Sequence, residues 1–150
     1  MVGRRILTPS QVERALYRIA LEVLERHYNT ELPLLWGVSP RGRPFALRLH
    51  HILQQEGSIV EIANEASQIP VNKSLLLVDD VLYTGRTIMS QIVSLWHKVS
   101  PPQIEVAVVV DRGHRSFPIV PNYVGLQLAT TLQEYVEVRS TEEGWEVWLV

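Results

Sequence analysis

The sequence contains no cysteine, which excludes disulfide bonds, a thiol nucleophile and cysteine-ligated zinc. It also lacks an apolar run of the roughly 20 residues that a membrane-spanning helix needs, and its first ten residues contain no apolar signal segment. Neither sign of charge is in large excess, because 14 Lys and Arg residues stand against 16 Asp and Glu residues. The overall charge therefore does not indicate nucleic acid or an anionic membrane as a partner. We expect a soluble, cytoplasmic protein without membrane contact.

The length and composition are those of one globular unit. The chain has 150 residues, of which 46% are hydrophobic and 20% are charged, a balance that is typical of a folded core. We find no internal repeat, no low-complexity tract and no Gly/Ser-rich linker that would mark a boundary. The sequence therefore predicts a single domain over residues 1–150.

The clearest predicted element is an amphipathic helix that begins after Thr8. Apolar residues recur at spacings of three and four between Val12 and Leu24, which places them on one helical face. Thr8, Pro9 and Gln11 form a capping-box pattern with proline at the first helical position. We therefore expect this helix to start at residue 9.

Short apolar strands and helices alternate in the next part of the chain. We expect strands at 33–38, 59–62, 75–78 and 104–110, helices at 45–55 and 86–99, and short strands at 123–126, 135–138 and 146–150. The alternation predicts an α/β fold with a parallel sheet covered on both faces and an antiparallel addition near the carboxyl terminus. Because ligands of such sheets bind at the carboxyl ends of the strands, the loops 39–43, 79–87 and 111–115 are the candidate site.

The segment 75–87 carries the most chemical information. A buried strand ends at two adjacent carboxylates, Asp79 and Asp80, and a Thr84-Gly85 turn then opens a helix that contains Thr87. Free backbone amides at a helix start, together with hydroxyls, bind phosphate. The carboxylates suit the vicinal hydroxyls of a ribose and, beside a polyphosphate, also favour Mg²⁺. An Asp pair alone often only solvates a loop, but the whole segment predicts a site for a ribose 5-phosphate.

The segment 75–87 resembles the phosphoribosyl pyrophosphate (PRPP) loop of the type I phosphoribosyltransferases. Its Val-Leu-Tyr centre is similar to the PyrR branch of that family, which combines pyrimidine-operon regulation with uracil phosphoribosyltransferase activity. Segments 13–26, 37–43 and 110–119 are similar to the same branch, so the resemblance covers nearly the whole chain. It implies a type I phosphoribosyltransferase-like fold, with a central parallel sheet flanked by helices and a small antiparallel C-terminal hood.

The resemblance also implies roles for individual residues. The expected catalytic residues are Asp79, Asp80 and Arg41. The residues expected to bind the phosphoribosyl group of PRPP are Asp79, Asp80, Val81, Leu82, Tyr83, Thr84, Gly85, Arg86 and Thr87. Those expected at the pyrophosphate are Ser39, Pro40, Arg41 and Gly42, and those expected at the base are Asp111, Arg112 and His114. The implied cofactor is Mg²⁺ that is carried by PRPP, without a metal site built by the protein alone.

The sequence departs from the family pattern at the segment that normally forms a mobile lid. Only residues 63–74 separate the strand candidates 59–62 and 75–78, and Lys73 is the only basic residue among them. A missing lid would expose the reacting sugar to water and would remove positive charge from the leaving pyrophosphate. Pro40, where the PyrR pattern has threonine, also removes one amide from an anion-binding loop.

A second departure concerns the RNA-binding surface of the PyrR branch. Leu21, Val120 and Leu126 stand where that pattern has His, Arg and Lys, and Ala129 replaces a proline. The loss of three phosphate-contacting groups removes electrostatic affinity for RNA, so we expect no RNA partner.

Three functions follow from these observations. The first is a PyrR-like phosphoribosyltransferase domain that binds PRPP or a nucleoside 5-monophosphate, with the reaction of uracil and PRPP to UMP and pyrophosphate weakened or lost. The second is a non-catalytic module that senses PRPP or a nucleotide, and the third, which is the weakest, is an RNA-binding attenuator of a pyrimidine operon. The resemblance also implies a homodimer or a larger homo-oligomer.

Overall fold

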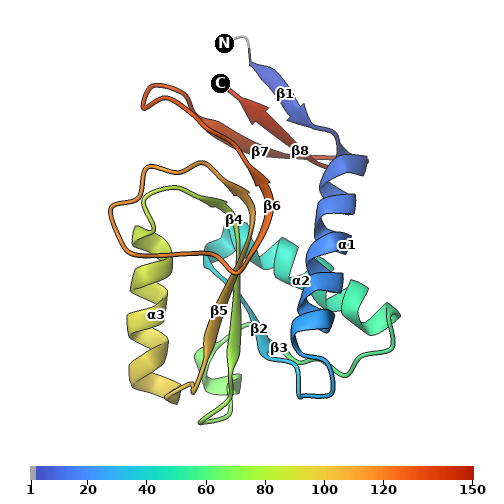
Figure 1. Ribbon diagram of the computed structural model, residues 1–150, viewed down its shortest axis with the longest axis vertical. Helices are drawn as coiled ribbons and strands as arrows, with labels where there is room; N and C mark the ends of the chain where they lie inside the picture. The colour runs from blue at the N-terminus through green and yellow to red at the C-terminus, as the bar shows by residue number, and fades with distance from the viewer. Residues whose placement is uncertain (1–2) are drawn as a thin grey trace.

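A computed structural model describes residues 3–150, so Met1 and Val2 of the predicted domain lie outside the described residues. Its centre is a sheet of five parallel strands in the order β3-β2-β4-β5-β6 (Figure 1). The strands are β2 (Leu34–Gly37), β3 (Ile62–Ala63), β4 (Leu75–Leu82), β5 (Ile104–Asp111) and β6 (Tyr123–Gln127). This arrangement confirms the predicted α/β fold.

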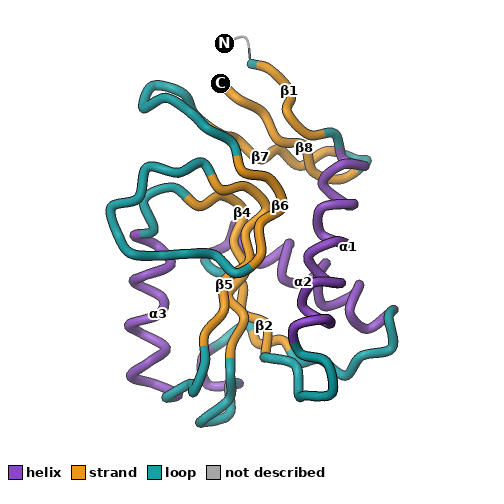
Figure 2. The backbone as a smooth tube through the Cα atoms, in the orientation of Figure 1, coloured by secondary structure: helices purple, strands orange, loops and turns teal. Residues whose placement is uncertain are grey.

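Helices cover both faces of the parallel sheet. The helices α1 (Pro9–Arg26) and α2 (Ser39–Gln55) pack on one face, and α3 (Arg86–Val99) packs on the other, as Figure 2 shows. Side chains alternate along β4, because Leu76 and Val78 belong to the core beneath α1 and α2, whereas Leu75 and Leu77 belong to the core beneath α3. The central strand is therefore apolar on both sides, which explains its uninterrupted run of leucines.

A second, antiparallel sheet forms the predicted hood above the carboxyl ends of the parallel strands. It contains β7 (Val136–Thr141), β8 (Gly144–Leu149) and β1 (Arg4–Leu7) in the order β1-β8-β7. We did not predict β1, because its four residues include two exposed arginines and it pairs with a strand near the other end of the chain. Figure 1 shows β1 and β8, which are far apart in the sequence, side by side in this sheet.

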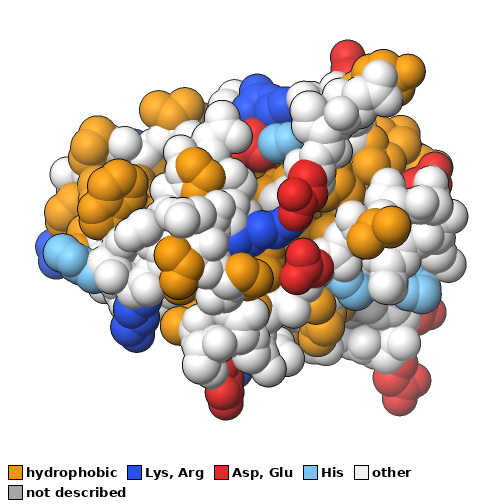
Figure 3. All heavy atoms as spheres, turned by 90° about the horizontal axis from the view of Figure 1, so that it is seen from below, with side chains coloured by type: hydrophobic (Ala, Val, Ile, Leu, Met, Phe, Trp, Pro, Cys, Tyr) orange, Lys and Arg blue, Asp and Glu red, His pale blue; other side chains and the backbone are white. Residues whose placement is uncertain are grey.

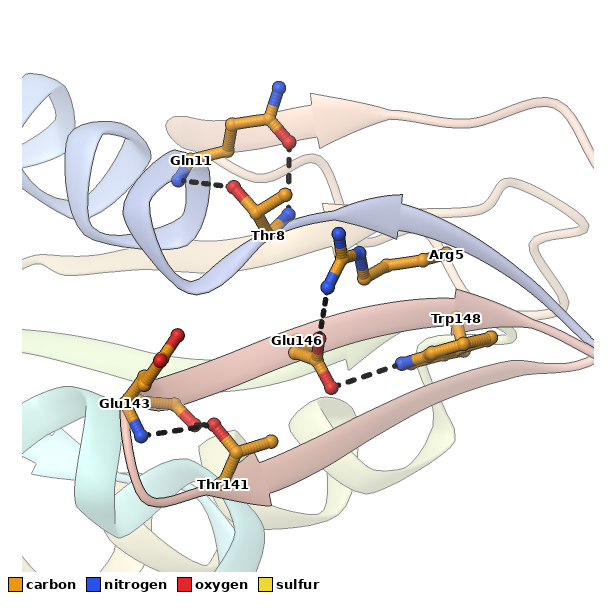
Figure 4. A network of polar contacts seen from close by, with 8 residues as sticks. Arg5, Thr8, Gln11, Thr141, Glu143, Glu146 and Trp148 are labelled. Atoms are coloured by element: carbon orange, nitrogen blue, oxygen red, sulfur yellow. Dashed lines mark hydrogen bonds and ion pairs between the residues drawn. The ribbon is translucent and has the colours of Figure 1, made fainter.

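The start of α1 agrees with the prediction. The Thr8 hydroxyl accepts a hydrogen bond from the amide of Gln11 at 3.2 Å, and the Gln11 side chain accepts one from the amide of Thr8 at 2.9 Å. Figure 4 shows this capping box beside the hood, where Arg5 of β1 forms an ion pair with Glu146 of β8 at 2.7 Å. The cap therefore marks the point at which the chain leaves the hood and enters the helical layer.

The predicted start of α2 was wrong. We expected a loop at 39–43 and a helix at 45–55, but α2 begins at Ser39 and includes Pro44. Pro40, the second residue of α2, is compatible with a helix start. Gly42 allows the first turn to press against β4, because a β-carbon there would overlap the carbonyl oxygen of Val78. The proline-rich sequence thus forms a helical turn that packs on the sheet.

Several predicted strand boundaries also changed. We ended the third strand at residue 78, but β4 continues to Leu82 because it pairs with β5 as far as Asp111. Asp79 and Asp80 therefore belong to the strand and do not start a loop. The predicted strand 59–62 is reduced to β3, which pairs with β2 through Ile62 and Ala63 only.

The short connection between β3 and β4 makes hydrogen bonds and ion pairs with neighbouring parts of the protein. It contains the short 3-10 helix Ala66–Gln68, and the amide of Asn72 donates to the carbonyl of Val99 in α3 at 2.9 Å. Lys73 forms ion pairs with Glu31 and with Glu61. These residues lie at the amino end of β4, and Figure 3 looks onto this end of the molecule, where basic side chains lie between acidic ones. Within residues 3–150, no helix is both long enough and apolar enough to cross a membrane.

Candidate functional site

Two helices begin at the carboxyl edge of the parallel sheet, one on each side of Asp79 and Asp80. The helix α2 starts at Ser39 after β2, and α3 starts at Arg86 after β4. The amino end of a helix carries unpaired amides and partial positive charge, so each start attracts an anion. The sheet edge therefore combines two anion-attracting ends with a central pair of carboxylates.

The turn before α3 presents free amides to a small cavity. Within residues 3–150, the amides of Gly85, Thr87 and Ile88 donate to no protein acceptor, whereas the amide of Arg86 donates to the Thr84 hydroxyl at 3.2 Å. The cavity has a volume of about 170 Å³. It is lined by Asp79, Val81, Leu82, Tyr83, Thr84, Gly85, Arg86, Thr87 and Ile88. The structure therefore brings together all but one of the residues predicted for the phosphoribosyl group, Asp80 being the exception.

Gly85 and a neighbouring loop hold this turn in shape. Gly85 has φ +87°, and a β-carbon there would lie 3.0 Å from Ile119. The carbonyl of Thr84 accepts hydrogen bonds from the amides of Ser116 at 2.9 Å and Phe117 at 3.0 Å. Because the loop after β5 supplies these donors, the turn keeps its amides pointing outward without a ligand.

The first turn of α2 forms the second anion-attracting end. Ser39 has φ +59°, and in the described part of the chain the amides of Ser39 and Arg41 have no protein acceptor. The amide of Gly42 is used, because it donates to the carbonyl of Val38 at 3.0 Å, and Pro40 has none. Arg41 is exposed, so its guanidinium is available to an anion. Pro40 thus removes one amide donor from this helix start, but the amides of Ser39 and Arg41 remain free for an anion.

The side chains of Asp79 and Asp80 line different cavities. Asp79 lines the cavity before α3, whereas Asp80 lines a larger cavity of about 410 Å³ beneath the hood. The wall of the larger cavity consists of Arg41, Pro44, Phe45, Asp80, Tyr135, Val136, Glu137, Val138, Ser140 and Trp145. A ligand that spans the sheet edge would therefore pass over both aspartates.

The aspartate pair also has an unusual affinity for protons. Burial and the neighbouring Asp80 raise the pKa of Asp79 to about 8, although the charge of Arg41 lowers it. Asp79 is 5% exposed, and one of its oxygens accepts a hydrogen bond from the amide of Asp80 at 2.9 Å. At neutral pH the pair therefore holds a proton that a bound cation would displace.

The three residues predicted to face the base, Asp111, Arg112 and His114, make contacts within the protein. Asp111 forms an ion pair with Arg115 at 2.7 Å, and His114 contacts the carbonyl of Thr130. Arg112 is 5% exposed, and it donates to the hydroxyl of Thr130 at 3.1 Å and to the carbonyl of Glu134 at 2.6 Å. None of these three residues lines either cavity described above. In this structure Arg112 and His114 tie the end of β5 to the chain that leads into the hood, whereas Asp111 holds Arg115 of its own loop.

The hood supplies residues that sequence reasoning missed. Tyr135, Glu137 and Ser140 of the β7 region and Trp145 of β8 line the cavity that contains Asp80. Alternation along β7 indicated a strand but not which of its faces would cover the sheet edge. Only the pairing of β7 with β8, and of β8 with β1, places these side chains there.

Comparison with known proteins agrees with this fold. The model of the phosphoribosyl transferase domain family matches residues 4–138. Among solved structures, the fold is similar to a hypoxanthine-guanine phosphoribosyltransferase (hpt-2) from Bacillus anthracis, with a TM-score of 0.72, 15% identity, and coverage of 86% of this chain and 84% of that chain. It is also similar to hypoxanthine phosphoribosyltransferase from Trypanosoma cruzi in complex with the product IMP, with a TM-score of 0.73, 16% identity, and coverage of 85% and 78%. The chain therefore belongs to the phosphoribosyltransferase domain family.

Relatives in sequence show which branch of the phosphoribosyltransferase domain family this chain resembles. The chain is 36% identical over 163 residues to the bifunctional protein PyrR of Listeria welshimeri, which covers 91% of this chain and 89% of that protein. It is 37% identical over 170 residues to the bifunctional protein PyrR of Deinococcus deserti, with coverage of 95% and 93%. The protein is thus a PyrR-like type I phosphoribosyltransferase domain. Because both aligned regions exceed 150 positions, these relatives contain residues that this chain lacks.

Proposed function

We propose that the sheet edge binds PRPP or a nucleoside 5-monophosphate. The observation that supports this proposal is the pair of helix starts, α2 at Ser39 and α3 at Arg86, on either side of Asp79 and Asp80. PRPP has the matching chemistry, because it carries a phosphate at one end of a ribose and a pyrophosphate at the other. A nucleoside 5-monophosphate would use the 5-phosphate cavity and the hood cavity only.

Different residues then bind the 5-phosphate, the ribose, the pyrophosphate and the base of the ligand. The 5-phosphate takes the free amides of Gly85 and Thr87 and the hydroxyls of this turn. Asp79 and Asp80 accept hydrogen bonds from the ribose hydroxyls. The pyrophosphate faces the first turn of α2, where the guanidinium of Arg41 is exposed. The base enters the hood cavity beside the end of β5, where Arg112 and His114 hold the approach to the hood and Asp111 holds Arg115 of the same loop.

The proposed cofactor is Mg²⁺ bound to the pyrophosphate of PRPP. Within residues 3–150, no group of three or more acidic or histidine side chains is placed to hold a metal ion alone. Asp79 and Asp80 are nevertheless oxygen ligands of the type that Mg²⁺ prefers. When bound, the ion neutralises charge that develops on the leaving pyrophosphate.

The proposed reaction is the transfer of the phosphoribosyl group to uracil. A nitrogen of uracil forms a bond to C1 of the ribose and loses its proton to the solvent, while the bond from C1 to the pyrophosphate oxygen breaks and pyrophosphate leaves. Arg41 stabilises the negative charge of the departing pyrophosphate. Asp79 and Asp80 lie beside the ribose, where positive charge develops as the bond to pyrophosphate breaks. The rest of the catalysis is positioning of the two reactants.

The short connection between β3 and β4 favours slow turnover and keeps the sensor function as the second candidate. Its only basic residue, Lys73, pairs with Glu31 and Glu61 at the amino end of β4. Four residues of β4, Leu75–Val78, separate that end from Asp79, which corresponds to roughly 13 Å. This connection therefore supplies neither a cover nor a positive charge to the pyrophosphate. A sensor needs the binding site but not the lid.

Calorimetric titration of PRPP and of UMP in the presence of Mg²⁺ tests the binding proposal. Thr87→Ala should weaken both ligands, because both carry a 5-phosphate. Arg41→Gln should weaken PRPP more than UMP, because only PRPP carries a pyrophosphate. Ser90→Ala, an exposed position one turn further along α3, is the control and should change neither affinity. If neither ligand binds, or if Thr87→Ala binds both unchanged, the proposed site is wrong.

Release of pyrophosphate from PRPP and uracil then separates the two candidates. Turnover that Arg41→Gln reduces supports the transferase. Binding of PRPP without turnover, for uracil and for other bases, supports the sensor.

A further inference from the structure

The loop after β5 runs beside the turn that precedes α3, and Figure 1 shows both at the carboxyl edge of the parallel sheet. Two backbone amides of this loop, those of Ser116 and Phe117, donate to the carbonyl of Thr84 in the turn. Among the loop's side chains in residues 3–150, only that of Arg115 donates to the backbone of the turn, at the carbonyl of Tyr83. Arg115 lines neither the cavity before α3 nor the hood cavity, so its effect on a ligand passes through the turn.

The guanidinium of Arg115 is held in one orientation by three acceptors. Its Nη1 donates to the carbonyl of Tyr83 at 2.9 Å, and its Nε donates to the carbonyl of Ile119 at 2.9 Å. Its Nη2 donates to the carboxylate of Asp111 at 2.7 Å. The side chain is 25% exposed, and only a planar fork of donors reaches all three acceptors at once. Arg115 thus joins the end of β5, the loop that follows it and the turn before α3.

The hydrogen bond to Tyr83 fixes the direction of the next amide. A trans peptide unit points its carbonyl and the amide of the following residue in opposite directions. Because Arg115 holds the carbonyl of Tyr83, the amide of Thr84 points away from the loop after β5. The amide of Gly85 does the same, because that loop also holds the carbonyl of Thr84. In the part of the chain that the structure describes, neither amide donates to a protein acceptor, and both residues line the cavity before α3.

The charge of Arg115 is neutralised within the loop. The carboxylate of Asp111 pairs with the guanidinium at 2.7 Å, and its side chain is only 10% exposed. The other oxygen of this carboxylate accepts a hydrogen bond from the amide of Gly113 at 3.0 Å, which keeps it beside Arg115. Because the ion pair has no net charge, Arg115 acts on an anion in the cavity through the shape of the turn and not through electrostatic attraction.

We propose that Arg115 is a positioning residue for the 5-phosphate of the ligand. It holds the turn so that the amide of Thr84 donates to the phosphate together with the amide of Gly85. Asp111 takes part in the same task, because it keeps the guanidinium in place. This inference rests on the proposed binding of PRPP or a nucleoside 5-monophosphate at the sheet edge, and it adds a residue that does not touch the ligand.

Calorimetric titration of the full chain with UMP, with ribose 5-phosphate and with pyrophosphate, each with Mg²⁺, tests the proposal. Arg115→Met should weaken UMP and ribose 5-phosphate by the same factor of about tenfold, because both need the ordered turn. It should leave pyrophosphate unchanged, because that ligand binds at the first turn of α2. Arg115→Lys should not restore the affinity, since lysine keeps the charge but lacks the planar fork. Unchanged binding of ribose 5-phosphate, a loss for UMP alone, or full recovery with lysine would overturn the proposal.

Asp111→Asn separates position from charge by the sign of its effect. The variant removes the negative partner and leaves the charge of Arg115 unneutralised. If Arg115 acts by holding the turn, the affinity for ribose 5-phosphate should not rise. A rise would show that the guanidinium attracts the phosphate by its charge, which would overturn the proposal.

Arg26→Met is the matched control, because Arg26 pairs with the buried Glu105 at 3.0 Å at the opposite end of β5. It should leave the affinity for ribose 5-phosphate unchanged. In the protein without ligand, ¹⁵N relaxation should show greater motion of residues 83–85 in Arg115→Met but not in Arg26→Met. If the unmodified protein binds no 5-phosphate, the proposed function fails, and this inference fails with it. If UMP binds and Arg115→Met changes neither affinity nor motion, this inference alone is wrong.

Discussion

The guanidinium of Arg112 lies over the ring of Tyr83, 3.9 Å from the ring centre. Tyr83 belongs to the turn that lines the phosphate cavity, whereas Arg112 also donates hydrogen bonds to Thr130 and to the carbonyls of Thr131 and Glu134. One buried side chain thus joins the phosphate turn to the chain that enters the hood. Arg112, a residue expected at the base, therefore also holds the phosphate turn to the approach to the hood.

Arg112→Lys should therefore lower the free energy of unfolding by about 1–3 kcal/mol, since lysine cannot reproduce the planar fork of donors to Thr130 and Glu134. Urea unfolding measures this loss, and Arg14→Lys at an exposed site is the control. Hydrogen exchange should show faster opening of residues 128–135 in the variant. Unchanged stability and exchange would mean that these contacts do not hold the hood.

Substitution of Gly85 separates the cost of a left-handed backbone from the cost of a side chain that contacts Ile119. Gly85→Ala should destabilise the fold by about 1–2 kcal/mol from the left-handed backbone alone, and the contact with Ile119 should add to that cost. Gly57→Ala is a matched control, because Gly57 has φ +88° and open space around it. Only Gly85→Ala should also weaken the binding of a 5-phosphate. Equal effects of the two variants on stability and binding would contradict this view of the turn.

The proton held by the aspartate pair predicts a pH-dependent stability. The pKa of Asp79 is raised to about 8 in the folded state by burial and by Asp80. The folded protein therefore binds more protons than the unfolded chain between about pH 4 and pH 8, so stability should fall as pH rises through this range. The slope is at most about 1.4 kcal/mol per pH unit.

Asp79→Asn isolates this effect, because asparagine resembles the protonated carboxyl and does not titrate. Urea unfolding between pH 5 and pH 9 should give a flatter dependence for the variant than for the unmodified protein. An identical slope in both proteins would assign the pH dependence to other groups.

The capping box of α1 is the simplest local prediction. Thr8→Ala removes the acceptor for the amide of Gln11 and should cost about 1 kcal/mol of stability, measured by thermal or urea unfolding. Thr8→Ser should restore most of the loss, and Ser10→Ala, at an exposed neighbouring position, should have little effect. Equal losses for Thr8→Ala and Thr8→Ser would show that the hydroxyl is not the stabilising group.

The sequence by itself determined the elements that depend on neighbouring residues. The capping box at Thr8 and the helix that begins at Arg86 follow from contacts within a few residues, and the structure has both. The apolar run at 75–78 likewise predicted a buried central strand. Local hydrogen bonding and side-chain period are sufficient for such elements, because their partners lie nearby in the chain.

Only the tertiary structure decided what those elements meet. The strand β1 exists because Arg4–Leu7 pairs with β8 from the far end of the chain, and α2 starts early because Gly42 fits against Val78. Arg112 reaches Glu134 and Tyr83, which no spacing rule connects. The hood cavity likewise combines Asp80 with Tyr135 and Glu137. These contacts are long-range, and their free energy comes from packing that a local pattern does not contain.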